Sequence, residues 1–524
     1  MDAALVAEQL ETRVSSREIA CWTVLLATAI GLLIWKHFTV YFLSWTDEQI
    51  HFYVARRMAE GAVLYRDIES ARPPLALLPL SRLIRMGISP LLAGRAIVFC
   101  SELAIGGLLF WGGRSLVSWR VGALSALLFL TSPEAFSRVH YTGIHLAALT
   151  AFACAIFSLR AQPWRAGLCL GLSLAADQHG LAVCGILGFL TLVRRPRDAL
   201  RFVLGALIVS VTVFGGVWLM GSRHLWKNLV EVHLFHLRPG QSGREFWEQL
   251  TPWLYEHGYL FVGAVVAIGA LGLRRMRTSA VNDSSRVARS RIVLVLAAAV
   301  AGHLAVVLTM SDASFLYIVV IAPLLCLLAG IGFEAVAAQC RRPEWRNCRV
   351  SVATGALVIA VTTGGWSAAR SHRERLDERH YSFLPHVLHG QVNHFLRIDI
   401  ARQVAGDLSK GGTIFGDPTI VSAVALDSGR RVSGELADLN PIWIQAGMIK
   451  REEVVSRIER DGVEAVITPA WFLVQDPYFS AYLDRCYEPP KIYQPAEGGD
   501  GDGIPDILVF HHVHGNAQCT GSQI

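Results

Sequence analysis

Charge is scarce in this chain of 524 residues. Charged residues make up 17% of it, whereas soluble proteins carry about 25%. Hydrophobic residues make up 53%, and the mean hydropathy is +0.41. Such a chain buries apolar surface against something other than its own core. The composition therefore excludes a soluble enzyme, a disordered chain and a secreted domain held together by disulfides.

Lysine is scarcer still, with five residues among 48 cationic ones. The skew towards arginine is compositional, so we expect no nucleic-acid partner. The ten cysteines are scattered, and neither a Cys-x-x-Cys pair nor a Cys/His ligand spacing occurs, which argues against a zinc site. Cys486 and Cys519 share the C-terminal part, and whether they pair is left open.

Long apolar runs are what the chain has in place of charge. Runs of about 20 apolar residues recur between residues 20 and 370, which is typical of a polytopic α-helical membrane protein. We expect about 11 spans, near 20–44, 91–111, 119–138, 142–159, 165–177, 180–193, 199–220, 258–273, 291–310, 314–333 and 350–369. Two short runs meet at Asp177-Gln178-His179, which suggests a helix interrupted inside the bundle.

Arginine concentrates in alternate loops between these runs. Five loops hold 18 Arg against three acidic residues, so the positive-inside rule places them in the cytoplasm. The N-terminus, residues 1–19, is then cytoplasmic, and the odd number of spans places the C-terminal part outside. The long loops 45–90 and 221–257 also lie outside. We expect an uncleaved first span and a multi-pass protein of a bacterial inner membrane.

Hydropathy falls after residue 370, which marks the end of the membrane domain 20–369. Residues 370–400 have the composition of a polar linker, and residues 401–524 that of an extracytoplasmic α/β domain with a mostly parallel sheet. We expect strands at 413–415, 430–433, 463–468 and 507–510, and helices at 419–427 and 450–461. No Gly-rich phosphate loop occurs in this part of the sequence.

The first outer loop carries the most chemistry. Asp47 and Glu48 stand side by side just after the first span, behind Thr46. One interpretation is structural, with Thr46 capping a helix and the acids complementing its dipole. The other is functional, because an ionisable group at the membrane surface can take a proton in a reaction.

Further charges lie along the same loop. Asp67 and Glu69 precede Arg72, which stands directly before Pro73-Pro74. Arg95 lies just inside the second span, where an unpaired charge is costly. It requires an acidic partner from this loop or a bound phosphate.

These residues together resemble the GT-C class of membrane glycosyltransferases, which use sugars carried on polyprenyl phosphate. The shared features are the acidic pair after the first span, the pattern Gly-x-x-x-Tyr-Arg-Asp at 61–67, the cation before Pro-Pro-Leu and the Arg of the second span. The most similar members are the protein O-mannosyltransferase-like and aminoarabinose-transferase-like enzymes. The resemblance covers residues 20–335 in organisation and is specific over 45–95.

The resemblance implies a role for each of these residues. Asp47 takes the place of the catalytic carboxylate, with Glu48 as its neighbour. Asp67 and Glu69 match a second acidic cluster that orients the acceptor or a cation. Arg72 and Arg95 match groups that bind the donor phosphate.

Three positions depart from the family pattern. His145 stands where the family often has Asp at the start of the fourth span. Asp177-Gln178-His179 occupies the broken-helix site, where the family often has Lys. Phe315-Leu316-Tyr317 replaces an Arg-Tyr pair near the tenth span.

The second outer loop, 221–257, mixes tryptophans with cations. This mixture fits a surface helix at the lipid headgroups. The alternative is a contact from Arg238 or Lys227 to the donor phosphate or the acceptor.

We therefore expect a membrane hexosyl- or pentosyltransferase that moves one sugar from a lipid-linked donor to an extracytoplasmic lipid, glycan or protein. Asp47 would act as base, with inversion at the anomeric carbon. We expect no metal ligands, and use of a divalent cation is left open. The alternatives are a transporter or flippase for a lipid-linked substrate and a non-catalytic subunit of an envelope assembly.

Overall fold

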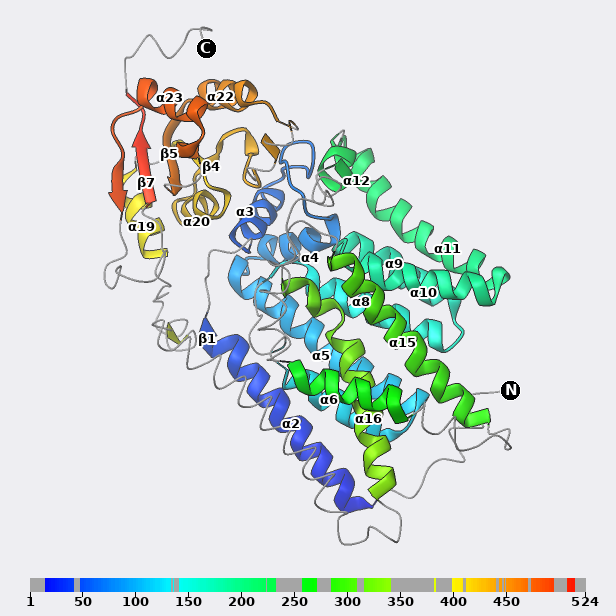
Figure 1. Cartoon of the computed structure of the whole chain (residues 1–524). Coiled ribbons are helices and arrows are strands. Elements are labelled where there is room, and N and C mark those ends of the chain that lie inside the picture. Colours follow the sequence, from blue (N-terminus) through cyan, green and yellow to red (C-terminus); the bar gives the residue numbers. More distant parts are fainter. Residues whose placement is uncertain are drawn as a thin grey trace.

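The computed structural model (Figure 1) describes most of the chain. The described residues are 15–41, 48–132, 135, 141–222, 224–231, 257–270, 284–308, 315–340, 381–382, 398–408, 411–439, 443–444, 447, 449–469, 473–493 and 507–513. They form a bundle of helices with a small sheet unit at one end.

Helices occupy the expected apolar runs, apart from 350–369, which lies outside the described residues. They are α2 (Ser16–Thr39), α5 (Pro90–Leu116), α6 (Trp119–Leu130), α8 (Ile144–Leu159), α9 (Pro163–Ala176), α10 (Gly180–Arg194), α11 (Pro196–Ser210) with η1 (Val211–Gly215) and α12 (Gly216–Leu219), His257–Ala270, α15 (Ser284–Leu308), and η3 (Phe315–Val320) with α16 (Ala322–Cys340).

Within the described part of the chain, four helical stretches are long and apolar enough to cross a membrane. They are Ser16–Trp35, Pro90–Leu116, Pro196–Leu219 and Arg289–Val307. The apolar helices between them are shorter, with 10 to 17 residues. The chain is thus a helical membrane protein in its N-terminal two thirds.

Local sequence explains where these helices begin and how closely they pack. Ser89 and Ser118 cap α5 and α6, each accepting a backbone N–H of the first turn. Where α9 crosses α11, Gly167 and Gly205 let the backbones approach. A Cβ on Gly167 would lie 2.0 Å from the Phe202 carbonyl oxygen, so only glycine fits.

Two short helices, α3 (Glu48–Ala59) and α4 (Pro74–Arg85), lie between the bundle and the sheet unit (Figure 1). Pro73 and Pro74 start α4, because a proline at the first helical position lacks only an N–H that would have no partner in the helix. Behind α2, β1 (Val40–Tyr41) pairs antiparallel with β2 (Tyr381–Ser382). Part of the expected linker 370–400 therefore returns to the end of the first span.

The C-terminal unit, comprising the described residues between 398 and 513, contains a five-stranded sheet of order β4-β3-β5-β7-β6. Its elements are α19 (Ile398–Asp407), β3 (Thr413–Gly416), α20 (Pro418–Ser428), β4 (Arg431–Val432), η5 (Ser433–Glu435), α22 (Arg451–Arg460), β5 (Val463–Pro469), η6 (Leu473–Gln475), α23 (Pro477–Cys486), β6 (Lys491–Tyr493) and β7 (Ile507–His511). The four expected strands and two expected helices are all present, whereas β6 and α23 were not expected.

The expectation of a mostly parallel sheet is wrong. β3 pairs parallel with β4 and β5, but β7 pairs antiparallel with both β5 and β6. A parallel partner needs a crossover long enough to return the chain to the same edge, usually a helix. The Gly- and Asp-rich sequence between β6 and β7 has no helical pattern, so β7 runs back beside β6.

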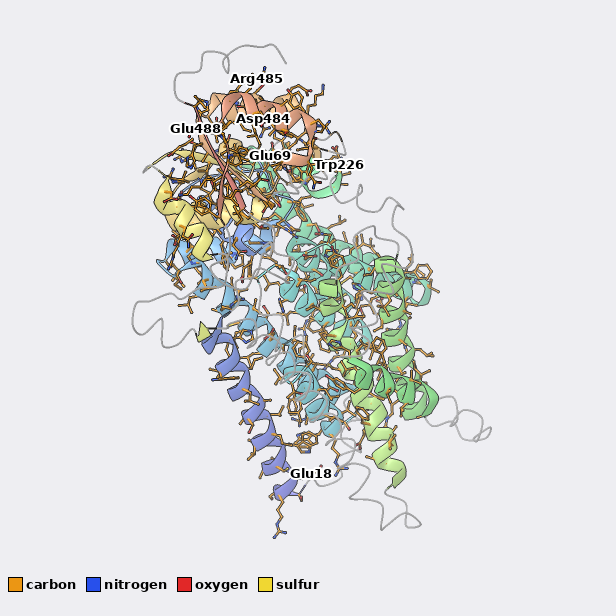
Figure 2. All side chains as sticks on the ribbon, turned by 60° about the vertical axis from the view of Figure 1, so that its left-hand side comes forward. Glu18, Glu69, Trp226, Asp484, Arg485 and Glu488 are labelled. Atoms are coloured by element: carbon orange, nitrogen blue, oxygen red, sulfur yellow. The ribbon has the colours of Figure 1, made fainter. Side chains whose placement is uncertain are left out.

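The C-terminal unit packs directly on α3, with which it shares one hydrophobic core. Ile50, Tyr53 and Val54 of α3 are buried together with Val421 and Val424 of α20. The Tyr53 hydroxyl accepts the Val432 N–H at 2.8 Å, and Arg56 donates to the Leu426 carbonyl at 2.9 Å. Figure 2 shows Glu69 beneath this unit and Glu18 at the opposite end of the molecule.

Candidate functional site

Glu48, the first residue of α3, forms a buried ion pair with Arg95 of α5. The two Arg95 Nη groups donate to the two carboxylate oxygens at 3.0 and 3.3 Å, and both side chains are at most 1% exposed. The Tyr141 N–H donates to the same carboxylate at 2.9 Å. Both oxygens are therefore engaged, and the start of α3 is tied to the second span and to the segment before α8.

A tight turn at residues 63–68 shapes the loop after α3. The Tyr65 N–H donates to the Ile68 carbonyl at 2.9 Å, with Tyr65 in the left-handed region at φ 62°. The Asp67 carboxylate accepts the Val63 N–H at 2.8 Å and pairs with Arg66 at 2.8 Å. Hydrogen bonds from Arg66 hold the pKa of Asp67 below its ordinary value. Asp67 thus braces the turn.

The turn places the Tyr65 side chain against the backbone of Arg72. The buried Tyr65 hydroxyl donates to the Arg72 carbonyl oxygen. Burial raises the pKa of Tyr65 well above its ordinary value, with Asp438 adding to the effect, so the hydroxyl keeps its proton. The backbone of Arg72 is therefore held from within the same loop.

The C-terminal unit also holds this loop. Asp438 accepts the Ala71 N–H at 2.7 Å and the Ser70 hydroxyl at 3.2 Å. Arg457 of α22 pairs with Glu69 at 3.0 Å and with Glu453 at 2.7 Å. Three consecutive residues before Arg72 are thus bound by side chains more than 360 positions away.

Arg72 lies near a polar cluster at the break between α9 and α10. Its charge acts on the Asp177 carboxylate. Asp177 is 3% exposed and accepts both the backbone N–H of His179, at 2.9 Å, and its ring Nδ1–H. Because the carboxylate can only accept, Nδ1 carries a proton and Nε2 is the free end of the ring.

The His179 ring is held on its other faces as well. It stacks on Tyr317 with ring centroids 3.8 Å apart and an interplanar angle of 17°. His303 of α15 donates from Nε2 to the Tyr317 carbonyl at 2.8 Å. The His179 side chain is 8% exposed, and its Nε2 has no hydrogen-bond partner among the described residues. This nitrogen is therefore available to a group that enters the site.

A second buried cluster lies deeper in the bundle. Glu102 of α5 contacts His37 of α2 at 3.1 Å and His145 of α8 at 3.6 Å. Glu102 is 0% exposed, so a buried carboxylate and two imidazole rings lie together where three helices meet. Within the described part of the chain, no group of three or more His, Cys, Asp or Glu side chains is arranged to hold a metal ion.

The structure therefore brings together part of the set expected from sequence. Glu48 and Arg95 meet each other, and Arg72 lies near Asp177. Asp67 and Glu69 hold the loop that carries Arg72. Asp47, Arg238 and Cys519 lie outside the described residues. His179 and Tyr317 were noted only as departures from a pattern, and no signal within the sequence pointed to Asp438 or Arg457.

Comparison with known proteins supports the fold. No protein-family model matches the chain, and no curated protein matches it by sequence. Three solved structures are similar: ArnT from Cupriavidus metallidurans in the apo state (16% identity, 96% of this chain and 100% of that one, TM-score 0.59), the same protein bound to undecaprenyl phosphate (15%, 97% and 100%, 0.60), and the oligosaccharyltransferase AglB from Archaeoglobus fulgidus with an inhibitory peptide and a dolichol-phosphate (10%, 94% and 76%, 0.53).

These proteins are GT-C glycosyltransferases: ArnT is an aminoarabinose transferase and AglB an oligosaccharyltransferase. The likeness spans the bundle and the C-terminal unit alike, since almost the whole chain is covered. The chain thus has the fold of the GT-C class of membrane glycosyltransferases.

Proposed function

We propose that this chain is a membrane glycosyltransferase that moves one sugar from a polyprenyl-phosphate carrier to an acceptor on the outer face of the membrane. One observation carries the proposal most directly. In a fold shared with carrier-bound ArnT and AglB, Arg72, Asp177 and His179 converge at the end of the bundle covered by the C-terminal unit.

In the proposed topology about 11 spans cross the membrane, and the Arg-rich loops face the cytoplasm. Residues 20–369 form the membrane domain, 370–400 the linker and 401–524 an extracytoplasmic domain. The polar cluster then lies at the outer surface. A carrier with its prenyl tail in the bilayer would present its phosphate at this depth.

The proposed reaction is a single displacement. The acceptor heteroatom attacks the anomeric carbon while its proton passes to the Asp47 carboxylate. The bond between that carbon and the carrier phosphate oxygen breaks, and its electron pair leaves with the phosphate. The configuration at the anomeric carbon inverts. The leaving group is already an anion, so the protein needs to supply positive charge and hydrogen-bond donors around it.

Arg72 and His179 are the proposed phosphate ligands. Arg72 offers a permanent cation at the polar cluster. His179, oriented by Asp177 through Nδ1, presents Nε2 to the phosphate and donates from it when the ring carries both protons. Arg238 of the second outer loop is a third candidate. Asp177 acts through His179 and is a positioning residue.

Glu48 and Arg95 are proposed as positioning residues for Asp47. Their ion pair fixes the first turn of α3, which directly follows Asp47 in the chain. Asp67 and Glu69 are proposed to position Arg72 through the loop. Asp67 stabilises the turn at 63–68, and Glu69 is held by Arg457. The acceptor class, the sugar and any divalent cation are to be identified by experiment.

Mass spectrometry of envelope glycolipids and glycoproteins tests the proposal. Cells with and without the chain would be compared. We expect loss of one sugar mass from a defined acceptor and accumulation of the polyprenyl-phosphate sugar. A transporter would instead leave every product of that donor depleted. An unchanged envelope with unchanged donor levels would refute transfer.

A further inference from the structure

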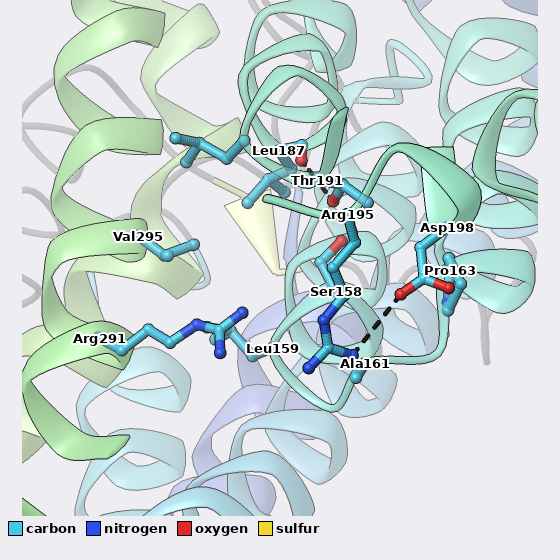
Figure 3. Close-up of a pocket in the computed structure, with 11 residues that line it drawn as sticks. Ser158, Leu159, Ala161, Pro163, Leu187, Thr191, Arg195, Asp198, Arg291 and Val295 are labelled. Atoms are coloured by element: carbon cyan, nitrogen blue, oxygen red, sulfur yellow. Dashed lines mark hydrogen bonds and ion pairs between the residues drawn. The ribbon is translucent and has the colours of Figure 1, made fainter. Parts of the chain in front are cut away.

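A pocket opens at the far end of the bundle from the proposed reaction site. The residues that line it lie at the ends of α8 and α10 and near the starts of α9, α11 and α15 (Figure 3). Helix α8 starts beside the polar cluster and has 16 residues, so roughly 24 Å of helix separates the two places.

Two arginines give the pocket its charge. Arg195 and Arg291 both line it, and Figure 3 shows their guanidinium groups directed into the same space. Asp198 also lines the pocket, 3.6 Å from Arg195. Two cations and one anion thus line the pocket. The Arg195 side chain is 57% exposed, so its guanidinium group is accessible to a ligand that enters the pocket.

The rest of the pocket is apolar. Leu159, Leu187, Leu190 and Val295 form the walls. The neighbouring helix faces continue this apolar surface outward, with Phe189, Val193 and Leu294 all more than half exposed. Such faces on α10 and α15 contact hydrocarbon in a bilayer. A ligand held here would therefore place a charged group on the arginines and a hydrophobic part along the helices.

We propose that this pocket binds the phosphate of an anionic phospholipid. Arginine recognises phosphate oxygens through paired N–H donors, and basic pockets between helices at the cytoplasmic side are suited to such headgroups. The pocket sits among the Arg-rich loops, on the face that the positive-inside rule assigns to the cytoplasm. The apolar walls favour a lipid over free phosphate, which has no hydrophobic part to bury.

Native mass spectrometry of the full-length protein, delipidated in a neutral detergent, tests this site. The probes are phosphatidylglycerol, phosphatidylcholine with the same acyl chains, and inorganic phosphate. Arg195→Gln and Arg291→Gln should each weaken phosphatidylglycerol binding about fivefold, the effect expected for one cation near an anionic headgroup. Phosphatidylcholine carries the same phosphate but also a choline cation, so it should bind more weakly and lose less affinity on either substitution.

Two further variants separate binding from loss of folding. Asp198→Asn removes the anion that lines the pocket and should strengthen phosphatidylglycerol binding. Arg197→Gln makes the same charge change on an exposed neighbour that does not line the pocket, and it should have no effect. Equal binding of both lipids, or equal affinities for Arg195→Gln and Arg197→Gln, would overturn the proposal. Displacement of phosphatidylglycerol by an equal concentration of inorganic phosphate would overturn the lipid assignment.

Discussion

The carboxylate of Asp438 accepts the backbone N–H of Ala71 at 2.7 Å, across 367 positions of sequence. The C-terminal unit thereby sets the position of the residue directly before Arg72. Asp438→Ala removes a charge-assisted hydrogen bond to the residue before Arg72, although the pair of Arg457 and Glu69 still holds the loop. We expect glycosyl transfer to fall about tenfold or more, because small displacements of a catalytic group are costly.

Transfer assays in membranes with matched protein levels check this expectation. Asp427→Asn is the matched control, since Asp427 belongs to the same unit and makes only an exposed pair with Arg402 at 3.4 Å. Equal transfer by both variants would show that the hydrogen bond from Ala71 to Asp438 does not matter for the reaction.

The pair of Glu48 and Arg95 predicts strong coupling in stability. Removing one partner leaves the other charge buried without this pair, which costs about 3–5 kcal/mol. Glu48→Gln and Arg95→Met should each lower the thermal stability of the purified protein sharply. The double variant should lose much less than the sum of the two. Additive losses in a double-mutant cycle would contradict a direct pair.

His179 is expected to contribute to transfer more than to folding. His179→Gln removes the ring that presents Nε2, and with it the stacking on Tyr317. We expect transfer to fall about 10- to 100-fold, since loss of one donor to a developing charge costs up to about 10²–10³ in rate. The lost stacking should also lower the melting temperature, so transfer is compared at matched levels of folded protein. His179→Lys should restore part of the activity, because it returns a cation to the site.

Asp177→Asn provides the matched comparison for His179. It keeps the shape of the side chain and replaces the carboxylate that accepts the His179 ring Nδ1–H. Transfer by this variant should fall, but less than transfer by His179→Gln, because the ring remains and only its orientation is weakened. Transfer equal to that of the wild type would show that the orientation of the ring by Asp177 does not matter for the reaction.

Asp461 predicts a pH dependence of stability in the C-terminal unit. Burial raises the pKa of Asp461, but hydrogen bonds from the Gly434 N–H and the Ser433 hydroxyl outweigh it and lower the pKa. A lowered folded pKa stabilises the folded state above the ordinary value of about 4. That contribution is lost as the pH falls through the folded value.

The difference in melting temperature between wild type and Asp461→Asn should be constant above about pH 5 and shrink below about pH 4. Asp484→Asn, which changes an exposed carboxylate on α23, is the matched control. A difference for Asp461→Asn that persists unchanged into strong acid would contradict the account.

The sequence predicted elements well where the pattern is local. The apolar stretch 463–468 and the Val/Ile stripe of 450–461 predicted β5 and α22 almost to the residue, because period and length identify such segments. β6 has only three residues and two of them are exposed, so no alternation marks it. The direction of β7 depends on how the chain returns from β6. The hydrophobic periodicity of the sequence carries no information about that connection.

The candidate site shows the same division. Acidic and basic residues in the first outer loop were visible because charge is rare near the spans. Their partners were not, since Glu69 meets Arg457 and Ala71 meets Asp438 only after the C-terminal unit has folded onto α3. The stacking of His179 on Tyr317 likewise joins a helix break to a segment more than 130 positions later.

The central claim is that Asp47 takes the acceptor proton in a glycosyl transfer. The most direct test is to measure the sugar mass on the envelope acceptor in cells that carry Asp47→Asn, the wild type or no copy of the chain, at matched membrane levels. The account predicts that Asp47→Asn matches the deletion, while Asp427→Asn matches the wild type. Full sugar transfer by Asp47→Asn, with the deletion still defective, would contradict it and leave Asp47 as a helix-capping residue.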